Sequence, residues 1–145
     1  MSKARDLSGG AGQWLSYVPV WGSNGTQPAL VDGTISGLYS KIGKTIQVRI
    51  YLQLGASSTV GTGARYSWTL PVSNKQLTTC NLIYLDSSTN YYYIGVGRTN
   101  ATAIDFVMNQ FGPGSLTGAA LFGPASPVVP ASGDFYIVTA TYEEA

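Results

Sequence analysis

The stretch that decides the fold is residues 45–54, which read TIQVRIYLQL. Two sets of side chains alternate along it without interruption: Ile46, Val48, Ile50, Leu52 and Leu54 in one set, and Thr45, Gln47, Arg49, Tyr51 and Gln53 in the other. Successive strand residues point to opposite faces of a sheet, whereas a helix would scatter the five apolar side chains around its surface. The stretch therefore predicts an antiparallel strand with one buried face and one solvated face.

The same period of two recurs along the chain from Trp14 onward. About seven or eight strands are expected in all, the clearest at 34–39, 45–54, 65–70, 77–85, 91–96, 102–108 and 135–142. Asp32-Gly33 is typical of a two-residue type I′ hairpin turn, and Gly43 falls between two expected strands. Helix content should be near zero, because Glu143 and Glu144 are the only glutamates and no Ala/Glu/Lys/Leu-rich segment occurs.

Many short strands with Gly/Pro turns need a second layer to cover them. The sequence therefore predicts an all-β fold, an antiparallel β-sandwich that is jelly-roll-like, forming one domain over residues 14–145. Residues 1–13 have only Leu7 as a sizeable aliphatic, so they are expected to form a flexible N-terminal arm, either a frayed end or a segment that orders on a partner. The Pro/Gly-rich loop 112–133 is expected either to cap an open end of the sandwich or to contact a neighbouring subunit.

Composition excludes several classes of protein. Charged residues make up 10% of the 145 residues, hydrophobic residues 44%, and the net charge is +1. This is too apolar for a disordered chain and lacks the basic footprint of a protein that binds nucleic acid or anionic membranes. No run is long and apolar enough to insert into a membrane as a helix, and the Met1 end lacks the apolar segment of a secretion signal, so synthesis in a cytoplasm is expected.

The residues needed for most catalytic and metal sites are missing or scattered. There is no His, which removes the commonest general base and metal ligand, and the single Cys80 is expected to be an inert buried side chain rather than a reactive thiol. Gly61-Thr62-Gly63 and Gly95-Val96-Gly97 lack the third glycine of a dinucleotide loop. Four aspartates are isolated from one another in the sequence: Asp32, Asp86, Asp105 and Asp134. A glycosidase that uses two of them as its catalytic pair is therefore only a minor alternative. We therefore expect a protein that is not an enzyme, with no cofactor and no metal.

Aromatic residues are the remaining signal. Tyr91, Tyr92 and Tyr93 must place side chains on both faces of a strand, so at least one points to solvent or to a partner. Tyrosine is enriched at protein interfaces, which makes these three, with Leu121 and Phe122, candidates for a subunit or partner contact. A platform that stacks on sugars is the competing interpretation. Near the start of the domain, three further aromatics are expected in the core: Trp14, Tyr17 and Trp21.

Several motifs resemble a recurrent domain of tailed-bacteriophage virion proteins. They are the opening WLSYVPVW of residues 14–21, the VDGTISGLYSKIGK segment of 31–44, the Leu-Pro of 70–71 and the closing GDFYIVTATYEE of 133–144, whereas residues 72–121 depart freely. The resemblance implies a non-enzymatic virion component, commonly a homotrimer, and carries over structural positions only. Those positions are Trp14, Tyr17, Pro19, Trp21, Gly33, Tyr39, Gly43, Lys44, Pro71, Gly133 and Asp134.

The function expected from these observations is that of a capsid decoration or cement protein. Such a trimer would be assembled in the host cytoplasm, reside in the virion, and stabilise the shell by binding the major capsid protein. The docking segment would lie in the arm, at Ser2, Lys3, Arg5, Asp6 and Leu7. The alternative is a tail-fibre tip or adhesin, held by tail proteins, that recognises a host surface glycan. A glycan depolymerase using an Asp pair stands below both.

Overall fold

The computed structural model describes residues 12–109, 119–121, 123–125 and 128–145, and every regular element in these ranges is a strand. No helix in these ranges is long and apolar enough to cross a membrane. The strands are β1 (Trp14–Tyr17), β2 (Trp21–Ser23), β3 (Thr34–Ile42), β4 (Thr45–Gln53), β5 (Tyr66–Thr69), β6 (Thr78–Asp86), β7 (Tyr91–Thr99), β8 (Ala103–Asn109), β9 (Ala119–Leu121) and β10 (Phe135–Glu143).

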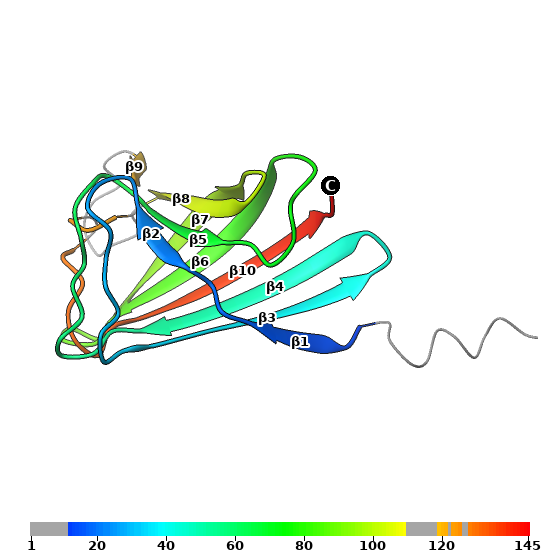
Figure 1. Cartoon of the computed structure of the whole chain (residues 1–145). Helices are drawn as coiled ribbons and strands as arrows, with labels where there is room; N and C mark the ends of the chain where they lie inside the picture. The colour runs from blue at the N-terminus through cyan, green and yellow to red at the C-terminus, as the bar shows by residue number, and fades with distance from the viewer. Residues whose placement is uncertain (1–11, 110–118, 122, 126–127) are drawn as a thin grey trace, which may run out of the picture.

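The strands form one antiparallel sheet in the order β1-β3-β4-β10-β6-β7-β8-β5-β2, and β9 pairs with β8 off this path. The C-terminal strand β10 lies in the middle, paired with β4 on one side and β6 on the other. The sheet curls so that β7, β8, β5 and β2 arch over the long strands β4 and β10, which gives a half-barrel (Figure 1).

The expectation of an all-β antiparallel fold is confirmed, but the described strands form one curled sheet, and a jelly-roll sandwich of two separate sheets is not shown. Hydrogen-bonded pairing runs without a break from β6 through β7 and β8 to β5. Curling brings the two ends of this single sheet face to face, because each strand is twisted relative to its neighbour. A single continuous sheet that curls on itself therefore covers its own apolar face.

A short N-terminal segment links the two edges of the sheet. β1 and β2 are the outermost strands at opposite ends, yet only residues 18–20 separate them in the sequence. Val20 and Thr69 hold this crossing, because the Val20 amide donates to Thr69 Oγ1 at 2.8 Å and the Thr69 amide donates to the Val20 carbonyl at 3.1 Å. The Tyr17 ring packs against Gly37, where a Cβ atom would lie 2.3 Å from that ring. The two outermost strands are only four and three residues long, and short edge strands limit pairing with other chains.

The core is an aromatic cluster enclosed by the curl. Tyr136 of β10 stacks on Tyr84 at 4.9 Å between ring centroids and also contacts Trp68 at 5.9 Å and Trp21 at 6.3 Å. These contacts join the middle of the sheet to its far edge, so the aromatic side chains hold the curl closed. Aliphatic side chains of β4 complete the core, and the alternation predicted for residues 45–54 is confirmed in full.

Two expectations about local structure are wrong. Asp32-Gly33 is not a type I′ turn, since neither residue has the positive φ that this turn requires. Instead, both Asp32 carboxylate oxygens accept the Ser57 amide, and Gly33 is needed because a Cβ there would lie 2.3 Å from the Gln53 carbonyl oxygen. Trp14 is not a core residue; it lies on the outer face, more than a third exposed. Tyr17 is half-buried, and Trp21 and Cys80 are buried as expected.

Because several tyrosines are buried, we expect the free energy of unfolding to fall at alkaline pH. Burial raises the pKa of Tyr142 to about 12 and raises the pKa values of Tyr66, Tyr84 and Tyr136 further, while unfolded tyrosine ionises near about 10. Because the folded values lie above the unfolded one, this stability is complete below pH ~10 and is lost as the pH rises through the folded values.

Absorbance at 295 nm during an alkaline titration should therefore show a group of tyrosines that ionise only as the far-ultraviolet circular dichroism of the sheet disappears. The same titration in denaturant should give one transition near pH ~10. Complete ionisation with the sheet signal intact would contradict this prediction.

Candidate functional site

The outer, convex face of the sheet carries the most distinctive surface of the molecule. On β4, β10, β6 and β7 the pairing registers place Tyr51 opposite Ile137, Ile137 opposite Ile83, and Ile83 opposite Ile94. These four side chains are exposed by 38%, 36%, 38% and 53% respectively. Neighbouring strands lie about 4.8 Å apart, so the four form an unbroken apolar row roughly 15 Å long across the sheet.

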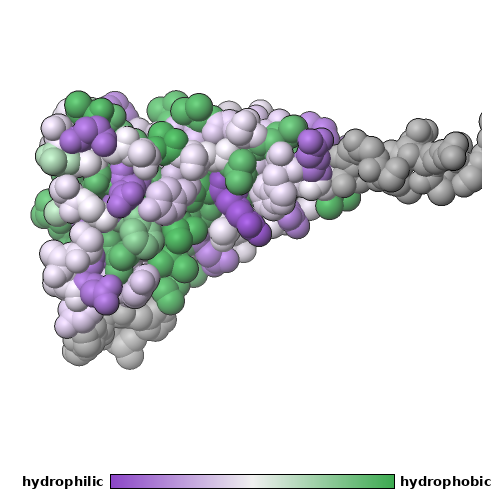
Figure 2. Space-filling view, turned by 90° about the horizontal axis from the view of Figure 1, so that it is seen from below, coloured by the Kyte–Doolittle hydropathy of each residue, from purple (hydrophilic) through white to green (hydrophobic). Residues whose placement is uncertain are grey.

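A second row extends this surface toward the loop end of the sheet. Phe135 is opposite Leu85, and Leu85 is opposite Tyr92, which is 58% exposed. The Tyr51 and Phe135 rings stack at 5.8 Å. We call the combined surface the apolar patch; it comprises Tyr51, Ile83, Tyr92, Ile94, Val96, Phe135 and Ile137, whereas Leu85, between Phe135 and Tyr92, is only 8% exposed. None of its members is charged. Figure 2, in which the molecule is seen from below the view of Figure 1, shows hydrophobic residues gathered in the middle of its broad part.

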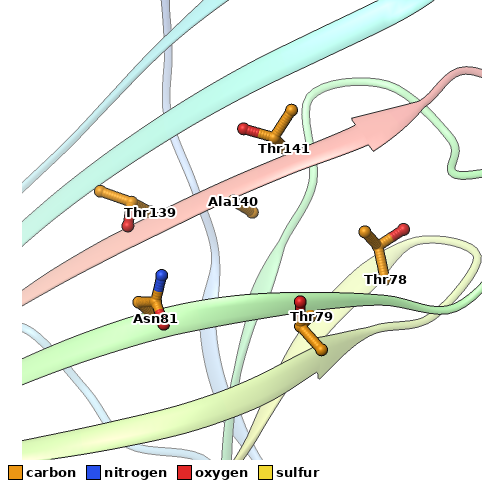
Figure 3. Close-up of a pocket in the computed structure, with 6 residues that line it drawn as sticks. All are labelled: Thr78, Thr79, Asn81, Thr139, Ala140 and Thr141. Carbon is orange, nitrogen blue, oxygen red and sulfur yellow. The ribbon is translucent and has the colours of Figure 1, made fainter.

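The opposite half of the same face is polar on β4, β10 and β6, whereas β7 places Val96 opposite Asn81. The polar part begins at Arg49 and Thr139, one outward position beyond the apolar row, and continues with Gln47, Thr141 and Thr79. Pairing of β10 with β6 ends at Ala140–Cys80, although β10 goes on pairing with β4 as far as Glu143. The separation of β6 from β10 leaves a hollow of about 250 Å³ between the strands, lined by Thr78, Thr79, Asn81, Thr139, Ala140 and Thr141 (Figure 3).

A second hollow of about 200 Å³ lies on the other flank of β10. Its lining adds Trp14, Gln47, Val48 and Arg49 to the same three residues of β10, Thr139, Ala140 and Thr141. Trp14 reaches across because its partner on β3 is the small Ser40, which is almost completely buried. The Arg49 guanidinium carbon lies 4.7 Å from the centroid of the Trp14 ring, a cation–π contact.

The sequence-predicted contact residues are divided by the strand pleat. Tyr92 belongs to the apolar patch, whereas Tyr93 is half-buried on the inner side, stacked on Tyr84 at 5.6 Å. Tyr91 is half exposed and opposite Asp86. Leu121 is paired with Val107 through the backbone of β9. The remaining predicted residues lie outside the described ranges: Phe122 and, in the arm, Ser2, Lys3, Arg5, Asp6 and Leu7.

The aspartates whose contacts are described hold loops. Asp134 is 1% exposed and accepts hydrogen bonds from the Tyr84 hydroxyl at 2.6 Å, the Ser87 amide at 2.8 Å and the Ala131 amide at 2.8 Å. Asp86 accepts a hydrogen bond from the Ser88 hydroxyl at 2.7 Å. This bond has the largest effect in lowering the pKa of Asp86, and hydrogen bonds from Thr89 lower that pKa further. Among the described residues no three His, Cys, Asp or Glu side chains form a group that could hold a metal ion.

The three isoleucines of the apolar row were not identified from the sequence. A usable signal exists, because Leu82-Ile83-Tyr84-Leu85 and Tyr136-Ile137-Val138 are consecutive apolar residues within strands. Successive strand residues point to opposite faces, so such runs must place apolar side chains on the solvent side as well as in the core. Which of these side chains meet across strands depends on the register, and the sequence does not show it.

Comparisons of the chain with protein-family models, with curated proteins and with solved structures found no match.

Proposed function

We propose that the protein is a non-enzymatic structural component of a virion that acts through protein contacts on the outer face of its sheet. The single observation that carries the proposal is the apolar patch. Monomeric soluble proteins rarely expose contiguous apolar surfaces beyond a few hundred Å², and larger ones mark interaction sites. A row of one tyrosine and three isoleucines across four adjacent strands, each at least a third exposed, is a contiguous apolar surface in the middle of the sheet rather than a set of scattered residues.

The partner that fits this patch best is a second copy of the chain. The patch is uncharged, so copies can pack it around a shared three-fold axis without like-charge repulsion, and the net charge of the whole chain is only +1. Subunit contacts of oligomers are richer in apolar and aromatic residues than the rest of the surface, as the apolar patch is. A homotrimer is the oligomer that the resemblance to bacteriophage virion domains implies.

In this proposal the trimer decorates a capsid and stabilises it by binding the major capsid protein. A ligand that binds only the assembled state stabilises it by RT ln(1 + [L]/Kd), about 2.7 kcal/mol per site at a hundredfold excess over Kd. The compact fold suits a particle surface, since the described part of the chain has no regular element other than strands and its one cysteine is buried. Residues 2–7 of the arm are the proposed docking segment.

A second candidate function is a receptor-binding tip that recognises a host surface glycan. The observation that favours it is the pair of hollows beside β10, which combine hydroxyl and amide side chains with the exposed Trp14. Both candidate functions can use the same trimer.

Sedimentation equilibrium and co-sedimentation with empty capsids test the first candidate. The purified protein is expected to sediment as a homotrimer and to pellet with capsids of its virus in hundreds of copies per particle. Deletion of residues 1–12 should abolish pelleting and leave the trimer intact. A protomer that stays monomeric at high concentration and ignores capsids would overturn the proposal, and capsid binding unchanged by the deletion would remove the docking role of the arm.

A further inference from the structure

We propose that the two hollows beside β10 together form a binding site for a short acidic saccharide, which lies across β10 and is held by Trp14 and Arg49. The proposal deepens the second candidate function, because it names the chemistry of the glycan and the residues that would hold it. It does not depend on the apolar patch or on the oligomeric state.

The two hollows are parts of one surface rather than separate sites. Both are lined by Thr139, Ala140 and Thr141, so β10 is a low ridge between them. Ala140 turns its side chain inward, so between Thr139 and Thr141 the ridge is formed by backbone. Figure 3 shows Asn81 and Thr139 on neighbouring strands at the edge of the first hollow. A linear ligand of two or more rings could cross the ridge with one ring in each hollow.

The lining chemistry fits a sugar. Threonine hydroxyls both donate and accept hydrogen bonds, and the Gln47 and Asn81 amides present a donor and an acceptor each, which is the mixture that ring hydroxyls require. Trp14 adds an aromatic side chain at the rim of the second hollow, more than a third exposed; because Arg49 lies over one face of its ring, a pyranose would pack against the remainder of the ring. An apolar or purely cationic ligand would leave most of these polar groups without partners.

The charge of the lining favours an acid. Arg49 is the only charged residue among the described residues that line the two hollows, and no lining residue carries a carboxylate. The contact with Trp14 holds the guanidinium at the rim, where its N–H donors can pair with a carboxylate through two parallel hydrogen bonds. A uronic acid or another carboxylated sugar supplies both that carboxylate and the hydroxyls for the threonines.

The experiment is a calorimetric titration of the full-length protein with a tetrasaccharide of alternating glucuronic acid and N-acetylglucosamine. A neutral N-acetylglucosamine tetramer and inorganic sulfate are titrated in parallel. The open, shallow hollows are expected to bind the acidic tetrasaccharide with a Kd of roughly a millimole per litre or below, and the other two probes at least tenfold more weakly.

Two variants locate the binding site. Arg49→Gln should weaken binding of the acidic tetrasaccharide at least tenfold, because it removes a charge-assisted pair. Thr139→Val keeps the shape of an outward side chain shared by both hollows and should weaken binding several-fold. Lys44→Gln removes the same charge from the β3–β4 turn, outside both hollows, and should leave Kd within twofold. Unchanged circular dichroism would show that each variant is folded.

Each alternative outcome overturns the proposal. Equal binding of the acidic and neutral tetramers would show that the carboxylate is not recognised, and equal binding of sulfate would reveal an anion site only. An effect of Lys44→Gln as large as that of Arg49→Gln would indicate diffuse charge attraction. No binding of any probe would remove the site while leaving the trimer and capsid tests unaffected.

Discussion

Replacement of Asp134 by alanine is expected to lower the free energy of unfolding by about 3–5 kcal/mol. The carboxylate is buried and joins three parts of the chain: Tyr84 of β6, Ser87 of the β6–β7 turn and Ala131 before β10. Hydrogen bonds to an ionised acceptor are worth about 1.5–3 kcal/mol each, and their loss would leave the Tyr84 hydroxyl and two backbone amides without this acceptor. The turn and the start of the central strand would loosen together.

Urea unfolding followed by tryptophan fluorescence measures this effect, with an unchanged denaturant slope as the sign of an intact two-state transition. Asp32→Ala is the matched control, since its carboxylate is exposed and accepts the Ser57 amide; its cost should stay within about 1 kcal/mol. Tyr84→Phe should cost about 1–2 kcal/mol, because only one of the hydrogen bonds to Asp134 is lost. Equal costs for Asp134→Ala and Asp32→Ala would show that the buried network is not what holds this end of the sheet.

The second large effect is expected on assembly. The double substitution Ile83→Lys with Ile137→Lys places two charges side by side in the middle of the apolar patch, since the two residues are cross-strand partners. Burying an unpaired charge in an interface costs several kcal/mol, so association should weaken at least a thousandfold, which corresponds to about 4 kcal/mol. The protein should then sediment as a monomer at concentrations where the wild type is trimeric.

The variant should remain folded, because both side chains point away from the core. Circular dichroism should therefore change little. Val31→Lys is the control, because Val31 is more exposed, at 69%, and lies in a loop outside the apolar patch; it should leave the sedimentation of the trimer unaltered. A trimer that survives the double substitution would place the subunit contact elsewhere and remove the main support for the proposed function.

The candidate site illustrates how far residue patterns reach. The alternation of residues 45–53 correctly separated Arg49, Gln47 and Tyr51 from the core, because the side-chain period of a strand is independent of its partners. It could not show that Tyr51 continues an isoleucine row while Arg49 borders a polar hollow. That division depends on β10 lying next to β4, and the two strands are separated by more than eighty residues in the sequence.

Trp14 shows the same limit at the level of one side chain. Its aromatic character favoured the core, and it shares a short segment with Tyr17 and Trp21. In the folded chain β1 is an edge strand, and the pleat places Trp14 and Tyr17 on opposite faces. Only the position of β1 beside Ser40 and within reach of Arg49 makes Trp14 a surface residue of the second hollow.

Local chemistry in the sequence determined that this protein is built of antiparallel strands, which side chains of its longest alternating stretch are buried, and that it has few charges with which to keep copies apart. Tertiary structure alone decided that the strands form one curled sheet, that the last strand lies in its middle, and that isoleucines from three strands meet on its outer face. The reason is that the period of a strand is a property of neighbouring residues, whereas strand order and register follow from packing the aromatic core between distant parts of the chain.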